Sequence, residues 1–262
     1  MRKEIWLVTA LFLVGLLTNI FSVWPYNTVV GFDQARDFFD ARKIILDRDL
    51  RIIGPTAGNN PNLHHGVAYL YYLIPPIFVG GGNPAVLAVW NGIFNAAAVI
   101  VIYFFAKALF STQGGSASGG KDNTAAFIAS LITGVSYYLT QYAGWLSNPT
   151  VTLLTVPVFF YGCWKYYQGK GWGLPLAGFF LGLTIQFELF FIYLIPTGIL
   201  AWLILRPKSP SLKLFFYSLL AIICSLSTMI LTEIRFHFEG IKSVIFAGQF
   251  VGGSEKVGFL NF

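Results

Sequence analysis

The chain has 262 residues, of which 56% are hydrophobic and only 11% are charged. Soluble domains carry about 25% charged residues, so this composition excludes a soluble enzyme and predicts an integral membrane protein. The net charge of +6 does not indicate a nucleic-acid partner. In membrane proteins, basic residues mainly set the topology and contact anionic lipid headgroups.

The N-terminus predicts a membrane helix that is retained in the mature protein. Arg2 and Lys3 precede an apolar run that continues to Phe21. This run is longer than the core of a signal peptide, and no small-residue cleavage pattern follows it. We therefore expect a first span over 4–21 and a polar loop over about 25–65.

The stretch 31–66 concentrates the chain's charge. It holds five of the eleven acidic residues, five of the seventeen basic residues and two of the three histidines. Ionisable groups between membrane segments are costly and mark functional sites. Residues that recur there at helical spacing are Asp33, Arg36, Asp37, Asp40, Lys43 and Asp47, opposite Phe32, Ala35, Phe39 and Leu46. This pattern predicts an amphipathic helix lying in the membrane interface, ended by the Gly54–Pro55 turn and the Gly–Asn–Asn–Pro–Asn run.

The distribution of basic residues predicts the topology. Further apolar runs occupy 85–106, 124–141, 151–164, 173–186, 188–205 and 213–231. The segment 67–82 is short and carries Pro75 and Pro76. If that segment does not cross, one side receives Arg2, Lys3, Lys107, Lys121, Lys165, Lys170, Arg206, Lys208 and Lys213. The positive-inside rule then predicts an all-α polytopic protein with about seven spans. Its N-terminus lies inside, the loop 25–84 lies outside, and 67–82 is interfacial or re-entrant.

The order of motifs in the first loop resembles a known family. Asp33–Gln34–Ala35–Arg36 is followed by Gly54–Pro55 and then by His65–Gly66–Val67–Ala68–Tyr69. This order is similar to that of polytopic glycosyltransferases of the GT-C fold, of the family 39-like, RgtA/B/C/D-like type. Protein O-mannosyltransferases and lipid A aminoarabinose transferases are more distant relatives. The runs 181–196 and 233–240 also fit, and we expect one GT-C-like domain over 1–262 that forms the front part of a longer chain.

The resemblance implies a membrane glycosyltransferase of the plasma membrane. It would move a sugar from a polyprenyl-phosphate donor to a lipid, glycan or protein acceptor on the non-cytoplasmic face. Asp33 matches the family's catalytic aspartate and would be the general base. Relatives often have Asp–Glu where this chain has Asp33–Gln34, so a second carboxylate would come from Asp37 or Asp40, or be absent. No cofactor is otherwise implied; relatives differ in their need for a divalent metal, for which His64 and His65 are the candidate ligands.

The residue types around Asp33 suit this chemistry. Displacing a polyprenyl phosphate needs a base for the acceptor hydroxyl and cations for the departing phosphate. Arg36, one helical turn from Asp33, can orient that carboxylate or bind phosphate at two points. Asp37 fits either catalysis or a solvated helix face. The solvated face is the preferred interpretation for Asp40, Lys43, Asp47 and Asp49.

The candidate substrate-binding residues are His65, Tyr69, Asn148, Gln186 and Glu188. Glu188 would face a polar cavity or reach water at the interface. Asn148 would contact sugar or phosphate, or form a plain turn with Pro149. Tyr69 would stack on a sugar or belong to an interfacial aromatic belt.

Two other classes of function stay open. A transporter or flippase of lipid-linked sugars would place ionisable groups near the middle of the membrane, where the predicted spans have almost none. A non-catalytic subunit of a glycan assembly complex is suggested by Gln34 and by the apparent truncation of the chain.

Overall fold

The computed structural model describes residues 2–24, 27–58, 60–110 and 119–245. The regular structure in these ranges is helical, and they contain no β-strand. The helices are α1 (Arg2–Val23), α2 (Phe32–Asp47), α3 (Ala68–Gly80), α4 (Pro84–Phe110), α5 (Gly119–Val135), α6 (Tyr137–Gly144), η1 (Asn148–Val151), α7 (Thr152–Tyr167), α8 (Gly173–Phe187), η2 (Leu189–Tyr193), α9 (Leu194–Leu205), α10 (Leu212–Arg235) and α11 (Glu239–Ile245).

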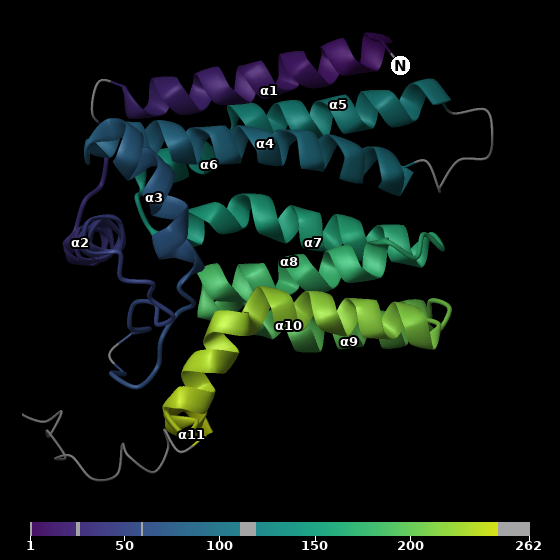
Figure 1. Ribbon diagram of the computed structural model, residues 1–262. Helices are drawn as coiled ribbons and strands as arrows, with labels where there is room; N and C mark the ends of the chain where they lie inside the picture. The colour runs from purple at the N-terminus through teal and green to yellow at the C-terminus, as the bar shows by residue number, and fades with distance from the viewer. Residues whose placement is uncertain (1, 25–26, 59, 111–118, 246–262) are drawn as a thin grey trace, which may run out of the picture.

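The helices α1, α4, α5, α7, α8, α9 and α10 run along one common axis (Figure 1). Of these, α1, α4 and α10 are long and apolar enough to cross a membrane. The ranges 68–80, 123–135, 173–187 and 189–205 are shorter apolar helices. Length and composition therefore indicate a membrane protein.

Small residues and uncharged hydrogen bonds hold neighbouring helices together. At the contact of α7 and α8, a Cβ added to Gly173 would lie 2.4 Å from the carbonyl oxygen of Gly162. Only residues without a side chain permit this approach. The same two helices are joined where Thr184 Oγ1 donates to Thr155 Oγ1 at 2.8 Å.

One expected helix is divided in the structure. The run 124–141 separates into α5 and α6 at Ser136, whose Oγ accepts the backbone N–H of Leu139 at 3.4 Å. Ser136 thus caps α6, and the prediction of one continuous helix over 124–141 was wrong. The run 188–205 begins with the 3-10 helix η2, which the Glu188 side chain caps, and continues into α9 without a gap.

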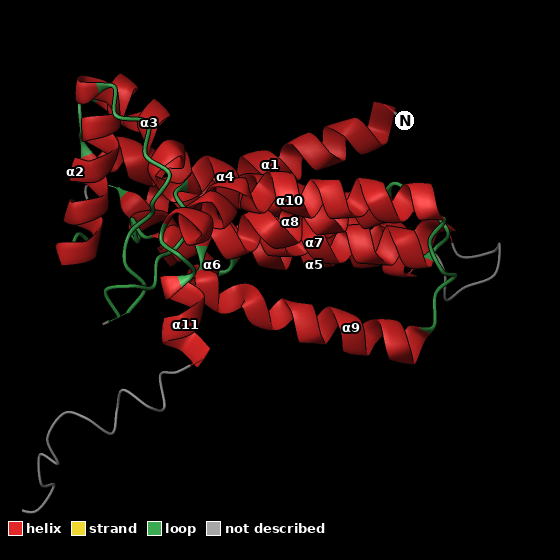
Figure 2. Cartoon of the chain, turned by 60° about the horizontal axis from the view of Figure 1, so that its bottom comes forward, coloured by secondary structure: helices red, strands yellow, loops and turns green. Residues whose placement is uncertain are grey.

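The helices α2 and α3 lie across one end of the bundle, as both overall views show (Figures 1 and 2). The predicted helix that includes Asp33 is confirmed as α2. It ends at Asp47, before the expected Gly54–Pro55 turn, because Arg48 adopts a left-handed conformation with φ 54°. It buries Asp37, Ala41 and Ile44. Of the two interpretations left open for Asp37, this burial contradicts the solvated helix face.

The opposite end of the bundle carries most of the basic residues outside the first loop. There lie the N-terminus of α1 and the connections after α7 and α9 (Figure 1). The basic residues at these helix ends are Arg2, Lys3, Lys107, Lys165, Lys170, Arg206, Lys208 and Lys213. The side chain of Lys121 lies outside the described residues.

Candidate functional site

Arg36 organises the charged end of α2. Its Nη1 lies 3.0 Å from Asp33 Oδ1, and its Nη2 lies 2.8 Å from Asp37 Oδ1. Its Nε also donates to Asp37 Oδ1 at 2.9 Å, and its Nη1 reaches Thr56 Oγ1 at 3.5 Å. One guanidinium thus holds both carboxylates, which we call with it the loop cluster: Asp33, Arg36 and Asp37.

The two carboxylates of the loop cluster have opposite surroundings. The Asp33 side chain is 68% exposed, whereas that of Asp37 is only 3% exposed. Burial raises the pKa of Asp37 to about 6, even though the adjacent Arg36 cation acts in the other direction. Asp33 is accessible to a substrate, and Asp37 anchors the arginine from below.

Asp40 does not join the loop cluster. Its Oδ1 lies 2.8 Å from Arg51 Nη1, and Asp49 Oδ2 lies 3.4 Å from Arg51 Nε. Arg51 comes from the chain that follows α2, so Asp40 and Asp49 are structural partners of that segment. A second carboxylate near Asp33 is therefore Asp37 and not Asp40.

A second group of polar side chains joins the first loop to η1 and η2. His65 Nδ1 accepts the backbone N–H of Leu189 at 3.2 Å and lies 3.5 Å from Glu188 Oε1. Asn148 Nδ2 donates to Glu188 Oε2 at 3.1 Å and to Phe187 O at 2.7 Å. Three of the predicted binding residues, far apart in sequence, therefore meet here.

The protonation of His65 follows from these contacts. Because Nδ1 accepts a backbone N–H, the ring proton belongs on Nε2. Burial, together with the positive charge of Arg36, lowers the pKa of His65 to about 4. The imidazole is neutral near pH 7, so it can donate through Nε2.

Burial also affects Glu188, whose residue is 9% exposed. Desolvation raises the pKa of this carboxyl, opposed by hydrogen bonds from the backbone N–H of Phe190 and the Asn148 amide. Glu188 lies within the protein and does not extend into water. This burial contradicts the interfacial alternative for Glu188, and the polar cavity stays a prediction.

The turn Gly54–Pro55 and the segment His65–Gly66 pack directly on each other. A Cβ on Gly54 would lie 2.4 Å from the carbonyl oxygens of both His65 and Gly66. A Cβ on Gly66 would lie 2.8 Å from Gln186 Cα. The His65 N–H donates to Pro55 O at 2.8 Å. These glycines allow the loop to press His65 against the end of α8.

Gln186 and Tyr69 lie beneath the surface. Gln186 Nε2 donates to Ser225 O and to Thr228 Oγ1, each at 2.8 Å, so it joins α8 to α10. The Tyr69 ring is fully buried and stacks on Tyr72 with centroids 6.0 Å apart, not at the surface as a belt residue would be. Its hydroxyl has no hydrogen-bond partner, and the nearby Asp37 and burial raise its pKa.

The described residues do not gather a metal site. No group of three or more His, Cys, Asp and Glu side chains is placed there to hold an ion. His64 Nδ1 pairs with Gly54 O at 3.1 Å, whereas His65 faces Glu188 and Leu189. The two candidate ligands thus have separate partners.

An apolar groove of about 570 Å³ begins beside this site. Its walls come from η2, α9, α10 and α11, and two ionisable residues, His64 and Glu233, line it. Leu189 also lines the groove, and the backbone N–H of this residue binds His65. The groove and the polar residues therefore share η2.

Some contacts of the candidate site could not be found from sequence patterns. Thr56 contacts Arg36, and the backbone N–H of Leu189 donates to His65. Neither residue belongs to a motif or a charge pattern that would mark it in the sequence. Comparisons of the chain with models of known protein families, with curated proteins and with solved structures find no match.

Proposed function

We propose that the protein is a multi-pass membrane glycosyltransferase that uses a polyprenyl-phosphate sugar as donor. One observation carries the proposal: an arginine-held carboxylate cluster on α2 and an apolar groove lined from η2, α9, α10 and α11 lie toward the same end of an apolar helix bundle. A substrate with a charged phosphate, a polar sugar and a hydrocarbon chain matches this combination. The lipid would occupy the groove while the phosphate and sugar face the loop cluster.

The proposed reaction is a direct displacement with inversion. The acceptor hydroxyl oxygen bonds to the anomeric carbon as the bond from that carbon to the phosphate oxygen breaks. The bonding electrons leave with the polyprenyl phosphate, and Asp33 takes the hydroxyl proton as general base. Asp33 suits this role because its carboxylate is exposed and oriented by Arg36.

The neighbouring residues have supporting roles in this proposal. Arg36 can offer its guanidinium to the leaving phosphate, since arginine binds phosphate at two points. Asp37, buried under Arg36, is a positioning residue that fixes the guanidinium. The neutral His65 can donate its Nε2–H to a phosphate or sugar oxygen, and Asn148 with Glu188 fixes the loop that holds it.

The proposed membrane placement follows from the two ends of the bundle. The basic helix ends would lie in the cytoplasm, which puts α2 and the site on the outer face. On α2, Phe32, Phe39 and Leu46 are exposed, and these apolar side chains would rest among lipids. The shorter helices would then cross the membrane together with α1, α4 and α10.

The proposal is tested with purified protein in liposomes containing a radiolabelled polyprenyl-phosphate sugar and a mixture of acceptor lipids. We expect labelled acceptor and free polyprenyl phosphate to appear in equal amounts. Movement of the intact donor across the bilayer without bond cleavage would instead identify a flippase. Activity only after addition of another subunit would identify a non-catalytic component, and either result would overturn the proposal.

The groove is tested with Ile230→Trp, which fills space in the groove wall away from the loop cluster. We expect transfer from a long-chain donor to fall about tenfold while transfer from a short-chain, water-soluble donor stays unchanged, because roughly 1.4 kcal/mol of lost chain contact is tenfold in binding. The control is Leu220→Trp, at an exposed position on the same helix outside the groove. Equal loss with both donors would remove the groove from the proposal.

A further inference from the structure

A second cavity lies within the bundle, away from the loop cluster. It has a volume of about 300 Å³ and is lined from α1, α4, α5, α6, α7 and η2. None of its lining residues is ionisable, but it includes the amides Asn19 and Asn95 and the hydroxyls Thr133, Thr140 and Thr152. We call it the amide cavity.

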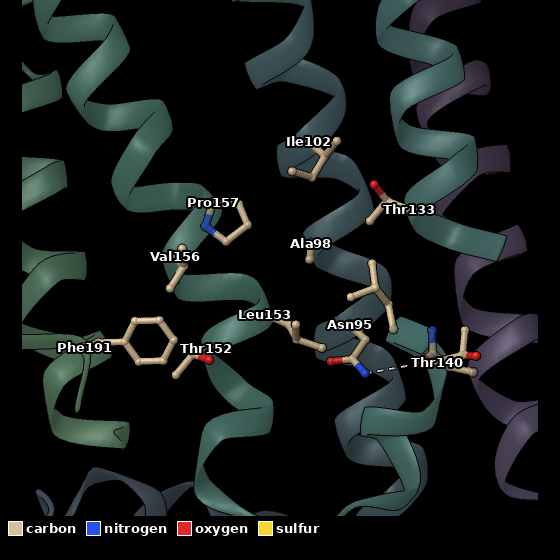
Figure 3. A pocket seen from close by; sticks show the side chains of 12 residues that line it. Asn95, Ala98, Ile102, Thr133, Thr140, Thr152, Leu153, Val156, Pro157 and Phe191 are labelled. Atoms are coloured by element: carbon tan, nitrogen blue, oxygen red, sulfur yellow. Dashed lines mark hydrogen bonds between the residues drawn. The ribbon is translucent and has the colours of Figure 1, made fainter. Parts of the chain in front are cut away.

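The amide of Asn95 leaves an acceptor without a partner in this cavity. Asn95 is 7% exposed, and its Oδ1 is buried with no hydrogen-bond partner. Its Nδ2 donates to Asn19 Oδ1 at 3.2 Å. Figure 3 shows the Asn95 oxygen on the side of the amide that faces Leu153 and α7, opposite the bonded nitrogen.

The orientation of the Asn95 amide is determined by its neighbour. Asn19 Nδ2 donates to Gly15 O at 2.7 Å, which turns Asn19 Oδ1 toward Asn95. Asn95 must therefore present its nitrogen to Asn19 and its oxygen to the cavity. A buried carbonyl oxygen without a partner costs about 1–3 kcal/mol, so a ligand that donates a hydrogen bond gains by binding there.

The other polar groups of the cavity favour the same kind of ligand. Thr133 Oγ1 donates to Ala129 O at 2.8 Å, and Thr140 Oγ1 donates to Tyr137 O at 2.9 Å. Each hydroxyl donates its hydrogen bond to a backbone carbonyl oxygen, so its own oxygen can still accept a hydrogen bond from a ligand. The lining has no charge to balance an anion, and burying an unpaired charge is far costlier than burying a hydroxyl.

We infer that the amide cavity binds the hydroxyl end of a neutral lipid, with the hydroxyl donating to Asn95 Oδ1. Much of the lining is apolar, including Ala98, Ile102 and Val156, and apolar cavities hold hydrocarbon better than water. Val156 and Pro157 are half-buried, so the cavity reaches the surface of the bundle. This inference stands independently of the proposed sugar transfer.

The probe is octanol that carries a photoreactive diazirine on its chain, applied to the detergent-solubilised full chain. We expect light to attach it to peptides containing Ala98, Ile102 or Val156, as mapped by mass spectrometry. Excess octanol should reduce labelling at least fivefold, whereas octane and octyl phosphate at equal micellar concentration should not. Equal competition by octane would overturn the inference, since it would show that the hydroxyl is not recognised.

Two variants test separately the hydrogen bond to Asn95 Oδ1 and the volume of the amide cavity. Asn95→Leu should reduce labelling about fivefold, the loss expected for one hydrogen bond worth roughly 1 kcal/mol. Ala98→Leu keeps both asparagines and fills the cavity, so it should also reduce labelling. Ser130→Ala is the matched control, because it removes another buried oxygen that lacks a partner outside the lining. Undiminished labelling in Ala98→Leu would contradict the inference. A high-resolution structure in which the cavity contains only ordered water would contradict it as well.

Discussion

The loop cluster and the amide cavity show two ways of placing polar groups in one protein. In the cluster, Asp33, Arg36 and Asp37 are charged groups at the end of the bundle. In the cavity, Asn19 and Asn95 are neutral and are joined by a single hydrogen bond. In the cluster, Asp33 is exposed and the buried Asp37 is paired with Arg36, whereas the lining of the amide cavity has amides and hydroxyls and no ionisable group. This difference follows from the cost of desolvating an ion, which a neutral group avoids.

The largest effect on stability is expected for Arg36→Ala. The substitution leaves the buried Asp37 carboxylate without its cation, and breaking a buried pair in this way costs about 3–5 kcal/mol. Denaturant unfolding in detergent micelles measures the change. Arg42→Ala, at an exposed position on the same helix with no resolved ion pair among the described residues, should change stability by less than about 0.5 kcal/mol.

A double variant sharpens this test. Adding Asp37→Leu to Arg36→Ala removes the unpaired carboxylate, so most of the lost stability should return. If the double variant is as unstable as Arg36→Ala alone, the cost arises from packing of the arginine and not from the stranded charge.

The next effect concerns the pH dependence of stability. The folded pKa of Asp37, about 6, lies above its ordinary value of 3.8. Its contribution to stability is therefore present at low pH and is lost as the pH rises through 6. Relative to Asp37→Asn, which keeps an oxygen acceptor for Arg36, the wild type should lose on the order of 2–3 kcal/mol between about pH 4 and about pH 8.

The effect of His65 on the pH dependence of stability has the opposite sign. The effect of Asp37 must therefore be measured as the difference between wild type and Asp37→Asn, in which the effect of His65 is common to both. Its folded pKa of about 4 lies below its ordinary value of 6.5, so its contribution is present above pH 6.5 and is lost on acidification toward 4. Parallel pH curves for wild type and Asp37→Asn would show that Asp37 does not titrate in this range.

The smallest effect is expected for an uncharged pair inside the bundle. Thr155→Val removes the acceptor of the Thr184 hydroxyl, which also donates to Phe180 O at 2.6 Å and so keeps a partner. Interhelical hydrogen bonds of this kind are worth about 0.6 kcal/mol, and unfolding in micelles should show a loss of that size. A loss as large as that of Arg36→Ala would erase the distinction between the two regions.

Periodicity and charge predicted the local parts of this structure. The helix after Asp33 and the pairing of Asp33 with Arg36 follow from spacing within one helical turn, because i and i+3 side chains share a face. The apolar runs that became α1, α4 and α10 were long enough to identify directly. The segment 67–82 was expected to be short and interfacial or re-entrant; α3 is a short helix across the end of the bundle, and its position in the membrane stays a prediction.

Contacts between distant segments could not be predicted in the same way. The meeting of His65, Asn148 and Glu188 depends on how the first loop folds over η1 and η2, and sequence spacing does not encode this. The burial of Asp37 was missed because helical periodicity gives the faces of α2 but not the neighbour on each face. The unpaired oxygen of Asn95 depends on the turn of Asn19 toward Gly15 O, which no motif signals.

The most direct test of the central claim compares two identical changes on one helix. Asp33→Asn and Asp47→Asn each replace an exposed carboxylate of α2 by an amide, but only Asp33 is held by Arg36. In the liposome transfer assay we predict that Asp33→Asn loses about 10²–10⁴-fold of the transfer rate, as removal of a general base does, while Asp47→Asn keeps it. Equal transfer by both variants would contradict the assignment of Asp33 as the base and the account built on it.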